Sequence, residues 1–375
     1  MAKKKQRGNG AGTVYPRKNK DGKTIGYRGS YFTLDGKRRY VSAKTKTEAQ
    51  RALREAMTDA DRGLTFDAGT MTLGEYLDRW LPNIKDTVRQ RTWERYEQIV
   101  RGHIKPGLGH QKLKDLTRTH VKGLYGKKRE CLSPRTVQYI HVTLHKALKE
   151  AVADNLIPRN VAEDIKPSKL KRKKINPLTP EQTKAFLMAA RGDRYEALYV
   201  IAVHYGLRQG ELLGLKWADI DLNAGTLQVR RTMSETRTGR IEEETKSGKG
   251  RRIDLSQTVI EALKSHRQRQ QEEINHANGT YQNRDLVFAS TVGTPTNSKN
   301  LYYRSFKRIL KRAGLPDIVF HGLRHTCATI RSMKGQHLKQ VQELLGHSSV
   351  AVTLDIYSHV IPGMGGGDVM EDALS

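Results

Sequence analysis

The feature that most constrains the fold of this chain is a stretch of nine residues, 166-KPSKLKRKK-174, in which six residues are basic and none is acidic. A run of like charges is typical of a solvated, extended segment and not of a packed core. A second polar stretch, 61–70, interrupts the hydrophobic pattern earlier in the chain. The 375 residues are therefore expected to form several domains separated by linkers.

The overall charge limits the classes of partner. The 68 lysine and arginine residues outnumber the 39 acidic residues, which gives a net charge of +29. Such a surface attracts nucleic acid or an anionic membrane. A membrane is the weaker alternative, because the chain has no run of about 18 apolar residues and no signal peptide. Cys131 and Cys327 are far apart in the sequence and indicate neither a disulfide nor a metal site. We expect a cytoplasmic protein associated with nucleic acid, with no metal or other cofactor.

Residues 1–62 are predicted to form a three-stranded sheet with one helix packed on it. Two turn signals, 19-NKDG-22 and 35-DG-36, separate short runs of β-forming residues. Thr45 and Glu48 then fit a capping box at the start of an amphipathic helix. A sheet of this kind can place basic side chains in a DNA groove, although a solvated basic face is the alternative. The candidate DNA-binding residues here are Arg17, Arg28, Arg38 and Arg39.

Residues 71–163 are predicted to form a small all-helical domain. Its longest pattern is 133-SPRTVQYIHVTLHKALKEAVADN-155, with Ser133 as N-cap and Pro134 at the first helical position. The basic linker that follows, 164–176, is expected to run along phosphates; a merely solvated linker or a localisation-like signal are the alternatives. Its candidate DNA-binding residues are Lys169, Lys171, Arg172 and Lys173.

Residues 177–362 are predicted to be mainly helical with a small antiparallel sheet. The strand patterns are 226–232 and 251–255, and the helical patterns are 180–190, 195–205, 259–271, 301–313, 323–333 and 338–345. The fold class is therefore multidomain: a small β-sheet plus helix, an all-α domain, and a mainly-α domain with a small sheet. A glycine-rich tail, 363–375, follows.

Five short contexts in this last domain offer chemistry. They are 206-GLRQGE-211, 245-TKSGKGR-251, 321-HGLRH-325, 344-LLGHSS-349 and 353-TLDIYSH-359. Two arginines suit the non-bridging oxygens of a phosphate, lysine and histidine can move protons, and a tyrosine hydroxyl can attack phosphorus. Taken singly, each residue is better explained as a surface ion pair, a solvated turn, a helix cap or a core aromatic. Their joint occurrence favours phosphoryl transfer by the set Arg208, Lys246, His321, Arg324, His347 and Tyr357.

The five contexts resemble those of the tyrosine recombinases, the phage-type integrase family. GLRQGE resembles the first-arginine motif, TKSGKGR the β-hairpin lysine, HGLRH the His-x-x-Arg box, and LLGHSS with Tyr357 the final histidine and nucleophile. The first two domains look like the arm-type DNA-binding and core-binding domains of integrases from temperate phages and conjugative elements. The resemblance implies that 177–362 is the catalytic domain.

The resemblance also implies a mechanism and partners. Tyr357 would form a 3′-phosphotyrosine bond, Arg208 and Arg324 would clamp the phosphate, Lys246 would be the general acid, and His321 and His347 would assist. The partners implied are double-stranded DNA with core-type and arm-type att sites, three further copies in a homotetramer, a DNA-bending host factor and a directionality factor. The tail 363–375 would dock on a neighbouring protomer, or it is a frayed terminus.

Glu211 lies three residues after Arg208 and shares its helical face, so we expect it to orient a catalytic cation; a simple ion pair is the alternative. The glycines beside Arg208 are expected to let the DNA backbone approach. Two functional alternatives stay open. One is a non-enzymatic DNA-binding regulator. The other is a recombinase that performs inversion, dimer resolution or topoisomerase-like relaxation.

Overall fold

The computed structural model describes residues 12–32, 38–61, 70–167, 176–244, 250–347 and 349. The chain separates into two compact units, residues 1–171 and 172–375. Several predicted features lie outside the described residues. They are the turn 35-DG-36, the linker residues Lys169, Lys171, Arg172 and Lys173, the catalytic candidates Lys246 and Tyr357, and the tail 363–375.

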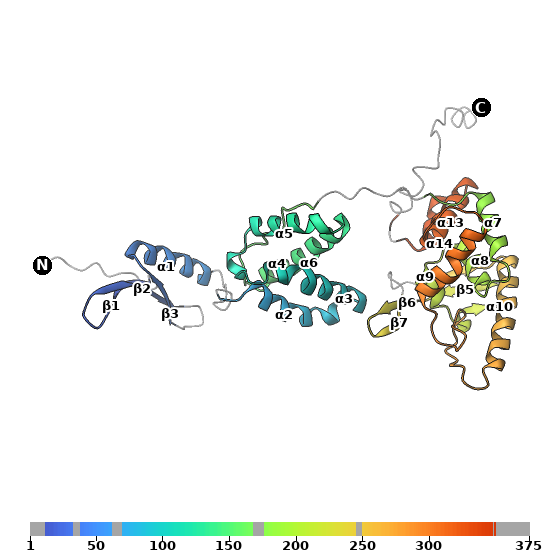
Figure 1. Ribbon diagram of the computed structural model, residues 1–375, viewed down its shortest axis with the longest axis horizontal. Helices are drawn as coiled ribbons and strands as arrows, with labels where there is room; N and C mark the ends of the chain where they lie inside the picture. Colours follow the sequence, from blue (N-terminus) through green and yellow to red (C-terminus); the bar gives the residue numbers. More distant parts are fainter. Residues whose placement is uncertain are drawn as a thin grey trace, which may run out of the picture. The chain divides into compact units, whose positions relative to one another are not determined.

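The N-terminal part of the first unit is a three-stranded antiparallel sheet with one helix on it, as predicted (Figure 1). Thr45 and Glu48 form the predicted capping box, since each backbone amide donates to the other side chain at 3.2 Å. Buried Tyr31 and Leu53 form the core between sheet and helix. The elements are β1 (Thr13–Lys18), β2 (Thr24–Phe32), β3 (Arg38–Ala43) and α1 (Lys46–Asp61).

The rest of the first unit is all-helical around its own core. The longest helix begins as predicted, with Pro134 in its first turn and the Ser133 hydroxyl accepting from the Thr136 amide at 3.2 Å. The elements are α2 (Leu73–Asn83), a 3₁₀ turn (Lys85–Thr87), α3 (Gln90–Ile99), a π-helical segment (Val100–Ile104), α4 (Lys105–Leu108), a 3₁₀ turn (Leu113–Asp115), α5 (Arg118–Cys131) and α6 (Pro134–Ala153).

The second unit is mainly helical. Its helices are α7 (Pro180–Ala190), α8 (Glu196–Tyr205), α9 (Gln209–Leu213), α10 (Gln257–His276), α11 (Ser298–Asn300), α12 (Lys307–Arg312), α13 (His321–Met333) and α14 (Leu338–Leu345). A 3₁₀ turn spans Trp217–Asp219, and a π-helical segment, Leu301–Phe306, joins α11 to α12.

Small antiparallel strands complete the second unit. The predicted strand 226–232 is in fact two strands that part at Arg230, because its first half pairs with β8 and its second half with β7. The strand β7 was not predicted, since its sequence GRIEEE has only one apolar residue and glutamate is a poor β-former. The strands are β4 (Ile220–Asp221), β5 (Thr226–Val229), β6 (Arg231–Thr236), β7 (Gly239–Glu244) and β8 (Arg251–Asp254).

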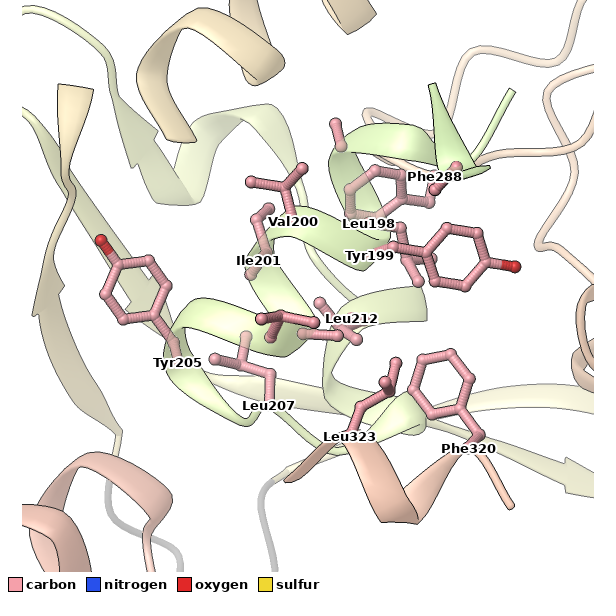
Figure 2. Close-up of a cluster of buried hydrophobic side chains, with 14 of the residues drawn as sticks. Leu198, Tyr199, Val200, Ile201, Tyr205, Leu207, Leu212, Phe288, Phe320 and Leu323 are labelled. Atoms are coloured by element: carbon pink, nitrogen blue, oxygen red, sulfur yellow. The ribbon is translucent and has the colours of Figure 1, made fainter. Parts of the chain in front are cut away.

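A continuous hydrophobic core supports both ends of the segment that carries Arg208 (Figure 2). Helix α8 is buried on nearly all sides, which is the pattern of a helix at the centre of a domain. Leu207 and Leu212, on either side of Arg208, and Leu323, beside Arg324, are at most 2% exposed. The two arginines therefore extend from rigid, fully packed backbone.

Candidate functional site

The turn that carries Arg208 is set by glycines. Helix α8 ends at Gly206, whose φ of +62° is a left-handed conformation that glycine adopts without strain. A Cβ at this position would collide with Leu345 and contact Cys327, and a Cβ at Gly210 would lie 2.5 Å from the Thr232 hydroxyl. The expectation that these glycines make room for DNA is therefore wrong. Their space is filled by the protein itself: Gly206 allows Leu345 and Cys327 to approach this turn, and Gly210 allows β6 to pack against α9.

Glu211 lies buried between two arginines. Its Oε1 accepts from Arg208 Nη1 at 2.7 Å, and its Oε2 accepts from Arg251 Nη2 at 2.7 Å and from the Arg208 backbone amide at 3.0 Å. Burial alone would raise the pKa of Glu211, but the hydrogen bonds and charges of Arg251 and Arg208 outweigh it and lower the pKa to about 2. Glu211 is thus ionised at neutral pH and orients both guanidinium groups.

Arg324 is held by backbone carbonyls instead of a carboxylate. It lies in the first turn of α13 and is 2% exposed. Its Nη1 donates to the Gly206 carbonyl at 2.8 Å and its Nη2 to the Leu345 carbonyl at 2.6 Å. Burial, followed by the charge of Arg208, lowers the pKa of Arg324 to about 9, so the side chain still carries its charge at neutral pH.

The end of α14 brings three arginines together. The consecutive carbonyls of Leu344, Leu345 and Gly346 accept from Arg251 Nε at 2.8 Å, Arg324 Nη2 at 2.6 Å and Arg208 Nη2 at 3.1 Å. The last carbonyls of a helix have no partner within the helix and carry its partial negative charge, so they attract cations. Residues far apart in the sequence thereby converge on one point.

Three histidines stand beside this point. Burial and the neighbouring positive charges lower the pKa of His321 to about 4 and that of His347 to about 3. His347 follows Gly346, the C-cap of α14, and its backbone amide donates to the Gln342 carbonyl at 3.1 Å. The ring of His325 meets the ring of His321 edge to face, with 4.8 Å between centroids, and burial lowers the pKa of His325 as well. All three imidazoles are therefore neutral at pH 7.

The structure thus brings Arg208, His321, Arg324 and His347 to one site, together with Glu211. Arg251 completes this site but was missed, because an arginine in the strand-like sequence RRIDL carries no signal that distinguishes it from a surface residue. Within the described ranges, no group of three His, Cys, Asp or Glu side chains is placed to hold a metal ion. A buried cluster of guanidinium groups of this kind can bind a phosphate and neutralise charge that develops on it.

The basic residues predicted on the N-terminal sheet do not share one face. In the β-pairing, Arg28 lies opposite Tyr15 and Arg38 opposite Phe32, on the face away from α1. Arg28 stacks on Tyr40 at 4.4 Å from the ring centroid. Arg17 is exposed and lies opposite Gly26 on this same face. In contrast, Arg39 lies opposite Tyr31, which is buried beneath α1, so Arg39 belongs to the helix-covered face.

A helix-rich unit that gathers arginines and neutral histidines around one point has the features of a phosphoryl-transfer enzyme. Residues 176–363 match the phage integrase family, and residues 72–128 match the SAM-like N-terminal domain of phage integrases. The chain is 33% identical to a XerC-like tyrosine recombinase of Caldanaerobacter subterraneus subsp. tengcongensis over 87% of its own length and 88% of the relative. It is 32% identical to an integrase of Streptomyces ambofaciens over 100% of its own length and 98% of the relative.

Solved structures share the fold. The Tn1549 transposon integrase in complex with circular intermediate DNA is similar with a TM-score of 0.68 and 23% identity, over 82% of this chain and 100% of that chain. A lambda integrase dimer bound to a COC′ core site gives a TM-score of 0.59 and 25% identity, over 76% and 95%. The chain belongs to the phage integrase family of tyrosine recombinases. It is a site-specific recombinase. No helix among the described residues has the length and apolar character to cross a membrane.

Proposed function

We propose that this recombinase integrates and excises a mobile element through a covalent bond between Tyr357 and the 3′-phosphate of a DNA strand. The tyrosine oxygen attacks phosphorus, the bond from phosphorus to the 5′-oxygen breaks, and the 5′-hydroxyl is released. A 5′-hydroxyl from a second DNA reverses the step. The phosphotyrosine bond keeps the energy of the broken phosphodiester, so ATP is not required.

The convergence of Arg208 and Arg324 on the end of α14 carries this proposal. Their guanidinium groups bind neighbouring carbonyls, those of Gly346 and Leu345, so both can reach the oxygens of one phosphate. Negative charge grows on these oxygens in the pentacoordinate transition state. Removal of one such preorganised donor costs about 3–4 kcal/mol in other enzymes, and we expect a similar loss for either arginine.

The proton transfers are assigned to the remaining members of the set. His321 is neutral and can accept the proton of Tyr357, and a bound phosphate would raise its low pKa by placing an anion beside it. A free tyrosine has a pKa of about 10, so it needs such a base at neutral pH. Lys246 protonates the leaving 5′-oxygen, and neutral His347 donates a hydrogen bond to the phosphate.

The other domains are proposed to bind DNA. Residues 1–62 would bind arm-type sites and 71–163 core-type sites, with the linker 164–176 along the backbone and 177–362 as catalytic domain. Solved lambda integrases are bound to a core site as a dimer and to a Holliday junction as a tetramer. By analogy, four protomers would exchange strands in two pairs, helped by a DNA-bending factor and a directionality factor. The tail 363–375 would contact a neighbouring protomer.

Covalent trapping tests the proposed function. The protein is incubated with sheared DNA of the host and the element, in EDTA and in Mg²⁺, stopped with SDS, and the protein-linked ends are sequenced. We expect adducts at a few discrete sites in both buffers, none with Tyr357→Phe, and wild-type adducts with Tyr303→Phe, an exposed tyrosine that serves as control. If adducts are absent despite tight, salt-sensitive DNA binding, the non-enzymatic regulator becomes the better explanation.

A further inference from the structure

Arg251 differs from Arg208 and Arg324 in that all three of its guanidinium nitrogens donate to groups of the protein, whereas the contacts of Arg208 and Arg324 described above use their two terminal nitrogens. Its Nε donates to the Leu344 carbonyl at 2.8 Å, Nη2 to Glu211 Oε2 at 2.7 Å, and Nη1 to Glu211 Oε1 at 3.3 Å. The side chain is 14% exposed. A planar guanidinium can serve two acceptors in fixed geometry, which a lysine cannot. Arg251 therefore binds two other elements at once, α9 and the end of α14.

Both contacts of Arg251 lead to the phosphate clamp. Glu211 links Arg251 to Arg208, because the same carboxylate also accepts a hydrogen bond from Arg208 Nη1. Leu344 immediately precedes the two residues whose carbonyls hold Arg324 and Arg208. The fit is close, since a Cβ at Gly346 would lie 3.0 Å from Arg251 Nη1. Removal of Arg251 would leave Glu211 with one cation and the end of α14 without its link to β8.

Arg251 also stands at the start of β8, five residues after Lys246 in the sequence. The strand is fixed on one side by its pairing with β5, where Arg251 lies opposite Val229. On the other side, within the part of the chain that the structure describes, it contacts α14, and the Arg251 side chain supplies the hydrogen bond to the Leu344 carbonyl. The position from which the chain extends back to the proposed general acid therefore depends on the same side chain.

We propose that Arg251 is a positioning residue for strand cleavage: by holding Glu211 and the end of α14 together, it aims Arg208 and Arg324 at one phosphate. This inference rests on the proposed function. It assigns to Arg251 no contact with DNA. Its loss should therefore slow the chemical step and leave the DNA affinity nearly unchanged.

The first test measures cleavage and binding separately. The substrate is a nicked duplex that carries a site mapped by covalent trapping. The cleavage rate is measured at a saturating concentration, under single-turnover conditions. We expect Arg251→Met to slow cleavage by about 100-fold, as for a misplaced catalytic group, while the Kd changes by less than about threefold. Arg252→Met is the matched control: its side chain is 67% exposed and, among the described residues, forms an ion pair with Asp254 at 3.4 Å, so its cleavage rate should be that of wild type. Equal rates for the Arg251→Met and Arg252→Met proteins would overturn the proposal.

A double-mutant cycle separates positioning from general destabilisation. Because Arg251 acts in part through Glu211, the rate loss of the Arg251→Met and Glu211→Gln double variant should be much smaller than the product of the two single losses. Rate losses that multiply would show independent roles and overturn the proposal. Arg251→Lys keeps the charge and serves if the methionine variant does not fold. We expect this variant to cleave at least about 10-fold more slowly than wild type, because an ammonium lacks the planar fork that holds both acceptors at fixed spacing; a wild-type rate would refute the geometric argument.

A structural measurement makes the outcome independent of cleavage. In a crystal structure of the DNA-free Arg251→Met or Arg251→Lys protein, the contacts of Arg208 with Glu211 Oε1 and the Gly346 carbonyl should be lost or rearranged. Unchanged contacts would disprove positioning by Arg251 even if cleavage is slow. If the wild-type protein forms no adducts, the result contradicts the proposed function. If the wild-type protein forms adducts and the Arg251 variants cleave at the wild-type rate, the result contradicts this inference alone.

Discussion

Replacement of Glu211 by glutamine should reveal how strongly the site depends on one buried charge. The substitution keeps the size of the side chain but removes the anion between Arg208 and Arg251. Two cations then face each other across a neutral amide, in a place that solvent barely reaches. The loss should appear as a lower free energy of unfolding of residues 172–375, because removal of one partner from a buried ion pair is strongly destabilising.

The pKa of Glu211 gives the magnitude. The value falls from an ordinary 4.5 to about 2 in the folded protein, and the side chain is only 3% exposed. A difference of ~2.5 units corresponds to about 3 kcal/mol. Since the folded pKa is the lower one, this stabilisation is complete above pH 4.5 and is lost as the pH falls towards 2. The difference between wild type and variant should therefore be about 3 kcal/mol at pH 7 and about 1 kcal/mol at pH 3.

Calorimetry on the full chain can measure this difference. For a unit of this size, about 3 kcal/mol lowers the unfolding temperature by about 6–12 °C. The control is Glu343→Gln, which removes an exposed partner of Lys339 and should cost less than about 1 kcal/mol. The reasoning fails if the Glu211→Gln variant has the same unfolding temperature as the Glu343→Gln control at pH 7. It also fails if the difference between wild type and Glu211→Gln stays constant down to pH 3.

Three further predictions concern the same site. Arg324→Lys should slow single-turnover cleavage by about 10²–10³-fold, because a single ammonium nitrogen lacks the planar fork with which Arg324 spans two carbonyls beside the phosphate; a loss below about 10-fold would contradict the clamp. Gly346→Ala should lower the unfolding temperature by several degrees in calorimetry, since a left-handed alanine costs roughly 1–2 kcal/mol and its Cβ would press on Arg251. The pKa values of His321 and His347, about 4 and 3, predict no imidazole titration in kcat/KM between pH 5.5 and 8; an inflection near 6.5 would refute their neutrality.

Local signals made most of the elements predictable. Helix α7 begins at Pro180 because Thr179 caps it and Pro180 fits the first turn, and both residues are legible in the sequence. The hairpin turn before Lys23 forms because Asn19 accepts from nearby amides. The break at Arg230 was not legible, since it depends on which distant strand each half pairs with. The π-helical segment Leu301–Phe306 was likewise predicted only as helix.

The residues of the site also fall into two groups, those that the sequence reveals and those that only the folded structure reveals. Motif residues such as Arg208 and Arg324 stand out because their chemistry is unusual beside glycine and histidine. Arg251 does not stand out, because its role comes from two contacts, with Glu211 and with a backbone carbonyl, that only the folded chain creates. The glycines beside Arg208 were expected to leave space for the DNA backbone, but protein atoms fill that space. A sequence shows that a position needs space and does not show what fills it.

The acceptors at the end of α14 are main-chain carbonyls, and this has a consequence for protein engineering. No side-chain substitution at Leu344 can delete the carbonyl that Arg251 uses, so the arrangement should tolerate many changes of residue type on the helix surface. One inserted or deleted residue in 338–345 would rotate the final carbonyls by about 100° around the helix axis, because an α-helix has 3.6 residues per turn. The arginines would then meet the wrong acceptors. Recombinase libraries built on this scaffold should therefore vary the exposed positions of α14 freely, while its length, its phase and the buried residues Val341 and Leu345 are kept constant.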